Sequence, residues 1–125
     1  VGGQVRAGET MTAPLLEQLT AIADQEGLPI AVGLYTDSPA PATYLVATPL
    51  SDMFDVYGDN QPGVEIEEVR LAVFTTGNYL PIRDRLTRAL VDAGLTVTVR
   101  RYVGYETDTG YHHYAIDVAA ANSWG

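Results

Sequence analysis

The fold is decided by residues 96–118, which read TVTVRRYVGYETDTGYHHYAIDV. Two runs of β-forming residues flank a short polar turn at 106–110, and apolar and polar side chains alternate along both runs. This alternation around a loop that ends in glycine predicts a β-hairpin in which Gly110 adopts a positive φ. Tyrosines at 102, 105, 111 and 114 gather near the turn, where cross-strand aromatic pairs stabilise the register. Another layer of structure must cover the apolar face of this hairpin.

Two other segments have the 3.6-residue periodicity of amphipathic helices. Residues 12–25 form the first, with Thr12 as a candidate N-cap and Gly27 as a C-terminal stop. Residues 79–93 form the second, and Gly94 ends it. The side chains expected to face the core are Leu15, Leu16, Leu19, Ile22 and Ala23 in the first helix, and Tyr79, Ile82, Leu86, Ala89, Leu90 and Ala93 in the second.

Three more strands are predicted between the helices. Residues 30–35 form a short strand, residues 43–48 form a second that Pro49 ends, and residues 64–75 form a long third strand. Residues 50–63 are expected to be a long loop that mixes aspartates with apolar side chains. Either these apolar groups pack on the domain's own core, or they become ordered against a neighbouring subunit.

The resulting order of elements is α-β-β-β-α-β-β. Mainly antiparallel strands with two helices on one face predict a two-layer α+β domain. We assign this single domain to residues 11–118. Residues 1–10 are then an N-terminal arm or an expression-derived segment, and residues 119–125 a C-terminal tail.

The composition restricts the classes of function. The chain has 125 residues and a net charge of −9, with no lysine among its seven basic residues. Gripping a nucleic acid needs clustered cations to neutralise phosphates, so this acidic balance argues against a nucleic-acid-binding surface. With no cysteine, neither a disulfide framework nor a thiolate metal site is possible. No apolar run approaches the length of a membrane span.

Asp108, Thr109 and Gly110 form the tripeptide of aspartic proteases. That chemistry needs two carboxylates sharing a proton in a buried cleft. The chain has a single copy in a polar turn, and turn chemistry explains the tripeptide because Asp caps its own backbone and Gly takes the left-handed conformation. The hypothesis of a protease is therefore weak.

The only histidines are His112 and His113. Neighbouring residues of a strand point to opposite faces, so the pair is unsuited to a shared metal, and zinc needs three or four convergent ligands. No phosphate-binding glycine pattern and no nucleophile elbow is present. We therefore expect a protein that is not an enzyme, with no catalytic residue, no metal and no cofactor.

Residues 106–114 read E-T-D-T-G-Y-H-H-Y and lead into the closing strand. This run, after an amphipathic helix, resembles the C-terminal part of the tail-completion (tail-terminator) proteins of long-tailed bacteriophages. The resemblance covers roughly residues 11–118 and is carried mainly by residues 78–118. It implies the two-layer α+β fold.

The resemblance also implies a role and a set of partners. The protein would form a ring, hexameric in that family, that caps the tail tube and joins it to the head connector. Its partners would be other copies of itself, the major tail-tube protein and head–tail connector proteins, with DNA passing through the channel without specific binding. It would lie at the head-proximal end of the virion tail after assembly in the host cytoplasm.

A ring subunit must present two different faces, because head-to-tail contacts are heterologous. We predict one face in the acidic and apolar segment that contains Asp52, Met53, Phe54, Asp55 and Tyr57, and the other at the basic positions Arg83, Arg85, Arg100 and Arg101. Apolar anchors would supply affinity, and charges would steer the approach.

Three alternatives remain open at the level of sequence. One is another head–tail connector or tail-tube protein of the same architecture. Another is a small ligand-binding or accessory α+β subunit of a cellular complex. The third is an enzyme whose site the sequence does not reveal.

Overall fold

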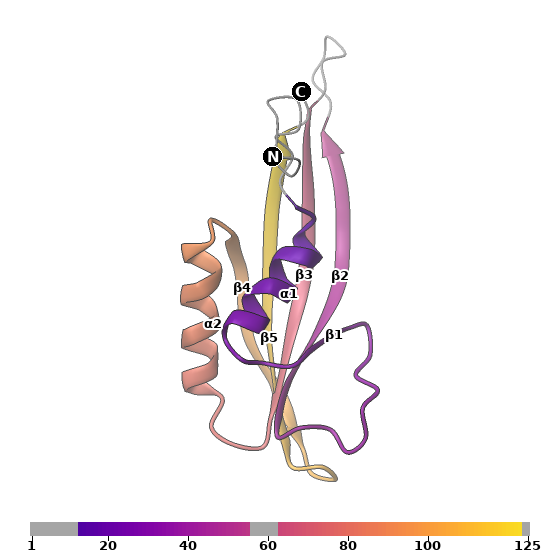
Figure 1. Cartoon of the computed structure of the whole chain (residues 1–125), viewed down its shortest axis with the longest axis vertical. Helices are drawn as coiled ribbons and strands as arrows, with labels where there is room; N and C mark the ends of the chain where they lie inside the picture. The colour runs from indigo at the N-terminus through magenta and orange to yellow at the C-terminus, as the bar shows by residue number, and fades with distance from the viewer. Residues whose placement is uncertain (1–12, 56–62, 124–125) are drawn as a thin grey trace, which may run out of the picture.

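A computed structural model of the chain describes residues 13–55 and 63–123 (Figure 1). Its elements are α1 (Leu15–Gln25), β1 (Ile30–Val32), β2 (Thr43–Asp55), β3 (Val64–Thr75), α2 (Leu80–Asp92), β4 (Thr96–Glu106) and β5 (Tyr111–Ser123). The predicted order of elements and the α+β class are confirmed.

The strands form one five-stranded sheet in the order β1-β2-β3-β5-β4. β1 pairs with β2 in parallel, and the other three pairs are antiparallel. Both helices pack on the same face, and alternate residues of β2, β3 and β5 point into the layer between helices and sheet. The buried core there includes Leu15, Leu19, Leu45, Leu71, Val73, Leu86, Leu90, Ile116 and Val118. The opposite face of the sheet has no covering layer in the described part of the chain, and we call it the open face.

The predicted hairpin is confirmed, and Gly110 has a φ of 80° in its turn. Tyr102 lies directly opposite Tyr114, as the clustering of tyrosines predicts. The simple alternation along β4 is wrong, because the pairing with β5 shifts between Val97 and Val99 and again between Tyr102 and Gly104. Each shift moves the following side chains to the other face. Val99 is therefore exposed.

β2 is longer than predicted. The strand does not end at Pro49 but continues to Asp55, with an irregularity in its pairing between Pro49 and Ser51. Proline is tolerated where an edge strand needs no inward N–H, and the irregularity absorbs it. Of the expected loop, residues 50–55 thus belong to the sheet, and residues 56–62 lie outside the described residues.

Three other boundaries differ from the predictions. β1 ends at Val32 because the chain turns at Gly33, which has a φ of 81°. α1 begins at Leu15 after Pro14, and Thr12 lies outside the described residues. β5 runs on to Ser123, so residues 119–123 belong to the sheet and not to a tail.

α2 matches its prediction to within one residue at each end. Asn78 accepts a hydrogen bond from the backbone N–H of Leu80 at 3.0 Å, which satisfies one donor of the first turn. Of the expected core face, Leu86 and Leu90 are fully buried, whereas Ala93 is exposed at the helix end. Within the described ranges, neither helix is long and apolar enough to cross a membrane.

Candidate assembly surfaces

The structure places the predicted acidic residues and the predicted arginines on opposite sides of the domain. Asp52 and residues 53–55 lie at the C-terminal end of β2, beyond the part of that strand that pairs with the short edge strand β1. Arg100 and Arg101 lie on β4, the opposite edge strand, and Arg83 and Arg85 lie on α2. Tyr57 lies outside the described residues. The acidic and basic sets are therefore separated by the whole width of the sheet.

The β2 edge is only partly covered. β1 pairs with residues 45–47 of β2, and the last contact is the backbone N–H of Gly33 donating to Ala47 O at 2.9 Å. Beyond Ala47, the outer side of β2 has no strand partner in the described part of the chain, from Thr48 to Asp55. We call residues 48–55 the free β2 edge.

The opposite edge is longer and also exposes apolar side chains. β4 pairs only with β5, so its outer side is unpaired along its 11 residues in the described structure. Val99, Val103 and Tyr105 are 47%, 48% and 53% exposed. An exposed edge strand presents a row of unpaired backbone groups and is a template for pairing with another chain. We call the outer side of β4 the free β4 edge.

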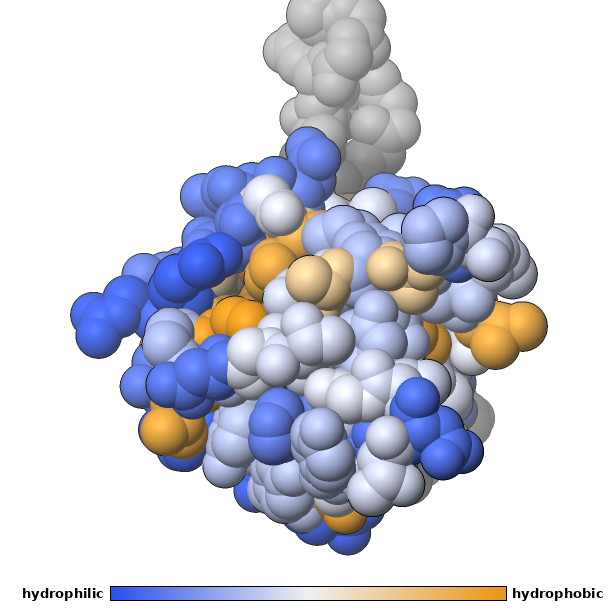
Figure 2. Space-filling view, turned by 90° about the horizontal axis from the view of Figure 1, so that it is seen from below, coloured by the Kyte–Doolittle hydropathy of each residue, from blue (hydrophilic) through white to orange (hydrophobic). Residues whose placement is uncertain are grey.

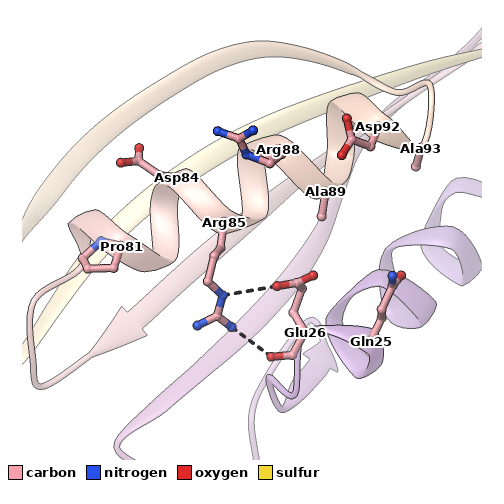
Figure 3. Close-up of a pocket in the computed structure, with 9 residues that line it drawn as sticks. All are labelled: Gln25, Glu26, Pro81, Asp84, Arg85, Arg88, Ala89, Asp92 and Ala93. Carbon is pink, nitrogen blue, oxygen red and sulfur yellow. Dashed lines mark hydrogen bonds and ion pairs between the residues drawn. The ribbon is translucent and has the colours of Figure 1, made fainter.

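Arg85 has an intramolecular role that the sequence does not predict. Its guanidinium donates to the Glu26 carboxylate at 3.2 Å and to the Glu26 carbonyl at 2.9 Å, which ties α2 to the C-terminal end of α1. Figure 3 shows Arg85 pointing across a surface pocket toward Glu26, whereas Asp84 and Arg88, which also line the pocket, extend away from Glu26. Arg85 therefore joins the helices of one subunit and is a poor candidate for contacting another.

The other arginines differ in how far they are engaged. Arg83 donates to the neighbouring Asp84 at 2.9 Å, and this hydrogen bond holds the pKa of the Asp84 carboxyl below its usual value. Arg100 reaches Thr87 at 3.3 Å and approaches Asp84 only to 4.0 Å. Arg101 is exposed and has no ion pair within the described residues.

Charge is distributed unequally between the two sides of the molecule. The segment from α2 through β4 contains five arginines and three acidic residues. Strands β2 and β3 contain five acidic residues and one arginine. A chain with a net charge of −9 thus has a basic edge and an acidic edge.

The open face is partly filled by aromatic rings and one ion pair. Phe74 stacks between Tyr44 and His113, with ring centroids 5.0 and 4.3 Å apart. Beside them, Arg70 donates two hydrogen bonds to the Asp117 carboxylate, at 2.8 and 3.0 Å. A shallow groove of about 370 Å³ runs over the three rings and Arg70, and Leu34, which also lines it, is 72% exposed.

The two histidines point to opposite faces, as predicted. His112 lies on the helix side, where its Nδ1 is 3.0 Å from the Tyr102 hydroxyl. His113 lies on the open face, and its Nε2 is buried with no hydrogen-bond partner among the described residues. Burial lowers the pKa of His113, so the neutral ring is favoured.

The turn of the hairpin is polar and exposed. Asp108 is exposed, and Thr109 donates a hydrogen bond to the Glu106 carboxylate at 2.9 Å. Figure 2 views the molecule from this end and shows apolar residues in small separate patches among polar ones. Among the described residues, no group of three histidines or acidic side chains is placed to hold a metal ion.

Sequence reasoning missed the free β2 edge and the aromatic stack. A signal for the stack was present, because Tyr44, Phe74 and His113 occupy the positions that alternate with the core residues of their strands. Which strand edges stay free depends on which strands become neighbours in the sheet, and a local sequence pattern does not encode this order. No protein-family model matches the chain, and comparison with curated proteins gives no match.

Proposed function

We propose that this chain is a non-enzymatic structural subunit of a bacteriophage head–tail junction, a tail terminator that forms a ring on the end of the tail tube. The observation that carries the proposal is the sheet with two free edges of opposite charge, the free β4 edge and the free β2 edge. Heterologous head-to-tail contacts need two different, complementary surfaces on each subunit. A self-contained binding module has no need of them.

The position within a virion comes from the likeness of residues 106–114 and the preceding helix to tail-completion proteins. The charge balance supports it, because six copies at −9 each give a ring that repels DNA phosphates. Contact between DNA and such a channel wall releases no counter-ions and so has no favourable binding term, and the DNA slides through instead of being held. The partners are then other copies of the chain, the major tail-tube protein and a head–tail connector protein.

The test is a polymerisation assay with the tail-tube protein of the phage that carries this gene. Tube subunits are allowed to elongate, and lengths are measured by electron microscopy with and without this chain. A terminator stops growth and appears as a ring at one end of each tube. Tubes of unchanged length with bare ends would overturn the proposal. Binding to the connector alone would do so too and would assign the chain to another connector position.

A further inference from the structure

We propose that copies of this chain join through their strands, the free β4 edge of one copy pairing antiparallel with the free β2 edge of the next. Tyr102 then lies opposite Asp52, and Glu106 lies opposite Thr48. The inference rests on the proposed function for the expectation that copies associate head to tail. It adds which strands meet, in which direction and in which register. Addition of a strand to an exposed sheet edge is a common mode of recognition.

The direction follows from the order of the strands. β2 is antiparallel to β3, β3 to β5, and β5 to β4, so β4 runs opposite to β2 within one subunit. When copies are related by rotation about an axis along the strands, each keeps the same strand directions. The β4 of one copy therefore meets the β2 of the next in antiparallel orientation.

The register is limited on one side by β1. Ala47 already pairs with Val32, so a strand from another copy can occupy the edge of β2 only from Thr48 onward. The end of β4 at the hairpin turn is Glu106. Placing Glu106 opposite Thr48 pairs residues 99–106 of β4 with all of the free β2 edge. A register shifted by two residues toward β1 is excluded, because it would place Tyr105 opposite Ala47, which β1 already occupies.

The irregularities of the two strands limit the register on the other side. Alternation switches between Pro49 and Ser51 in β2 and between Tyr102 and Gly104 in β4. In the proposed register these switches lie opposite each other, at residues 50–51 and 103–104. Thr48 and Glu106 therefore share one face on one side of the switch, and Asp52 and Tyr102 share the opposite face on the other side.

The pairings within one subunit confirm this match of faces. Asp52 pairs with Glu67 and Tyr102 with Tyr114, and both sets lie on the helix-covered face. Thr48 pairs with Arg70 and Glu106 with Tyr111, and both sets lie on the open face. A register shifted by two residues away from β1 would set Gly104, aligned with His113 on the open face, against Asp52 on the opposite face.

The charges agree with the same register. Arg100 and Asp52 both lie on the helix-covered face and become diagonal neighbours across the junction, a separation of about 7–8 Å that long side chains span. Asp52 is exposed and has no ion pair within the described residues. The junction also covers Val103 and Tyr105, which are exposed in the isolated subunit.

Cysteine cross-linking tests the pairing, because the natural sequence has no cysteine. Two matched double variants carry Asp52→Cys with Tyr102→Cys, and Thr48→Cys with Glu106→Cys. Residues directly opposite each other have Cβ atoms about 4.5–5.5 Å apart, within reach of a disulfide after small adjustments. Both matched variants should give ladders of covalent multimers on oxidation.

Two swapped double variants use the same four substitutions and serve as controls. They combine Asp52→Cys with Glu106→Cys, and Thr48→Cys with Tyr102→Cys. In the proposed register the partners are four residues apart along the strand, about 13 Å, so these variants should stay single chains. Thermal melts check that each variant folds. Tyr102→Cys removes a ring packed on Tyr79 and could prevent folding. In that case the test rests on the pair Thr48→Cys and Glu106→Cys, because both positions are exposed.

Each outcome supports or overturns the pairing. Ladders from the swapped variants would mean parallel strands, and dimers from Tyr102→Cys alone would mean that two β4 edges meet. The mass of the reduced samples separates this inference from the proposed function. A ring without cross-links in the matched variants overturns the pairing and leaves the ring intact, whereas a monomer in reduced samples overturns both.

Discussion

The side chain of Glu67 on β3 accepts a hydrogen bond from the backbone N–H of Leu15 at 2.7 Å. Leu15 is the first residue of α1, whose N-terminus has no capping side chain of its own. A strand residue thus supplies the cap, and its negative charge lies at the positive end of the helix dipole. This contact fixes the position of α1 on the sheet.

Glu67→Ala should lower the free energy of unfolding by about 1 kcal/mol, the typical cost of losing an N-cap. Glu67→Gln keeps an acceptor oxygen and should cost less. Urea unfolding of both variants measures the difference. Glu68→Ala is the matched control, because Glu68 lies on the other face of the sheet, where it accepts a hydrogen bond from the Ser51 hydroxyl at 2.8 Å. Equal losses in Glu67→Ala and Glu68→Ala would contradict the capping role.

His113 should make stability depend on pH. Burial lowers its pKa from 6.5, with Arg70 and Arg101 acting in the same direction and Glu106 against it. The unfolded chain therefore binds the proton more readily than the native state. The contribution of neutral His113 is fully present above about pH 6.5 and is lost as the pH falls below that value.

His113→Phe removes the titrating group and keeps a ring against Phe74. Between about pH 7.5 and pH 5.5, the wild-type protein should lose more unfolding free energy than this variant. Urea unfolding at both pH values gives the two differences. Parallel losses in the two proteins would show that His113 does not titrate differently on folding.

Gly110→Val should destabilise the hairpin by about 1–3 kcal/mol, because a β-branched residue is strained at positive φ. The native φ is 80°. Gly104→Ala is the matched control on the same hairpin, since an added Cβ there meets nothing within 4 Å and the position has no positive φ. Thermal melts compare the two. A Gly110→Val protein as stable as Gly104→Ala would exclude a conformational requirement at the turn.

Arg101→Glu should weaken association of the subunits without lowering the stability of each subunit. The loss should be largest at low salt, where screening between charges is weakest. Arg85→Glu should do the reverse, because Arg85 ties α2 to Glu26 within one chain. Sedimentation across a salt series, with urea unfolding of both variants, separates the two effects. Normal assembly of Arg101→Glu at low salt would remove Arg101 from the interface.

The parts of the fold that could be predicted are those encoded locally. The helices follow from the spacing of residues such as Leu86 and Leu90, and the hairpin follows from alternation on both sides of Gly110. Both signals lie within a few residues of each other in sequence, so no long-range contact is needed to read them.

The extension of β2 could not be predicted in the same way. Pro49 is a strong stop signal, yet residues 51–55 pair with residues 64–68 across an irregularity that no local pattern marks. The basic interface positions stay a prediction. Arg101 stays free of ion pairs in the described structure, but Arg85 lies within reach of Glu26 only after the helices pack. Contacts between distant segments decided each of these differences.

The mass of the native particle tests the central claim most directly. Sedimentation equilibrium or native mass spectrometry of the wild-type protein, at low salt and over a range of concentrations, gives the number of chains per particle. A subunit with two complementary edges should form one closed species whose mass is a whole multiple of 13.4 kDa, six-fold in the ring implied by the likeness to tail terminators. A protein that remains at 13.4 kDa at every concentration would contradict the account.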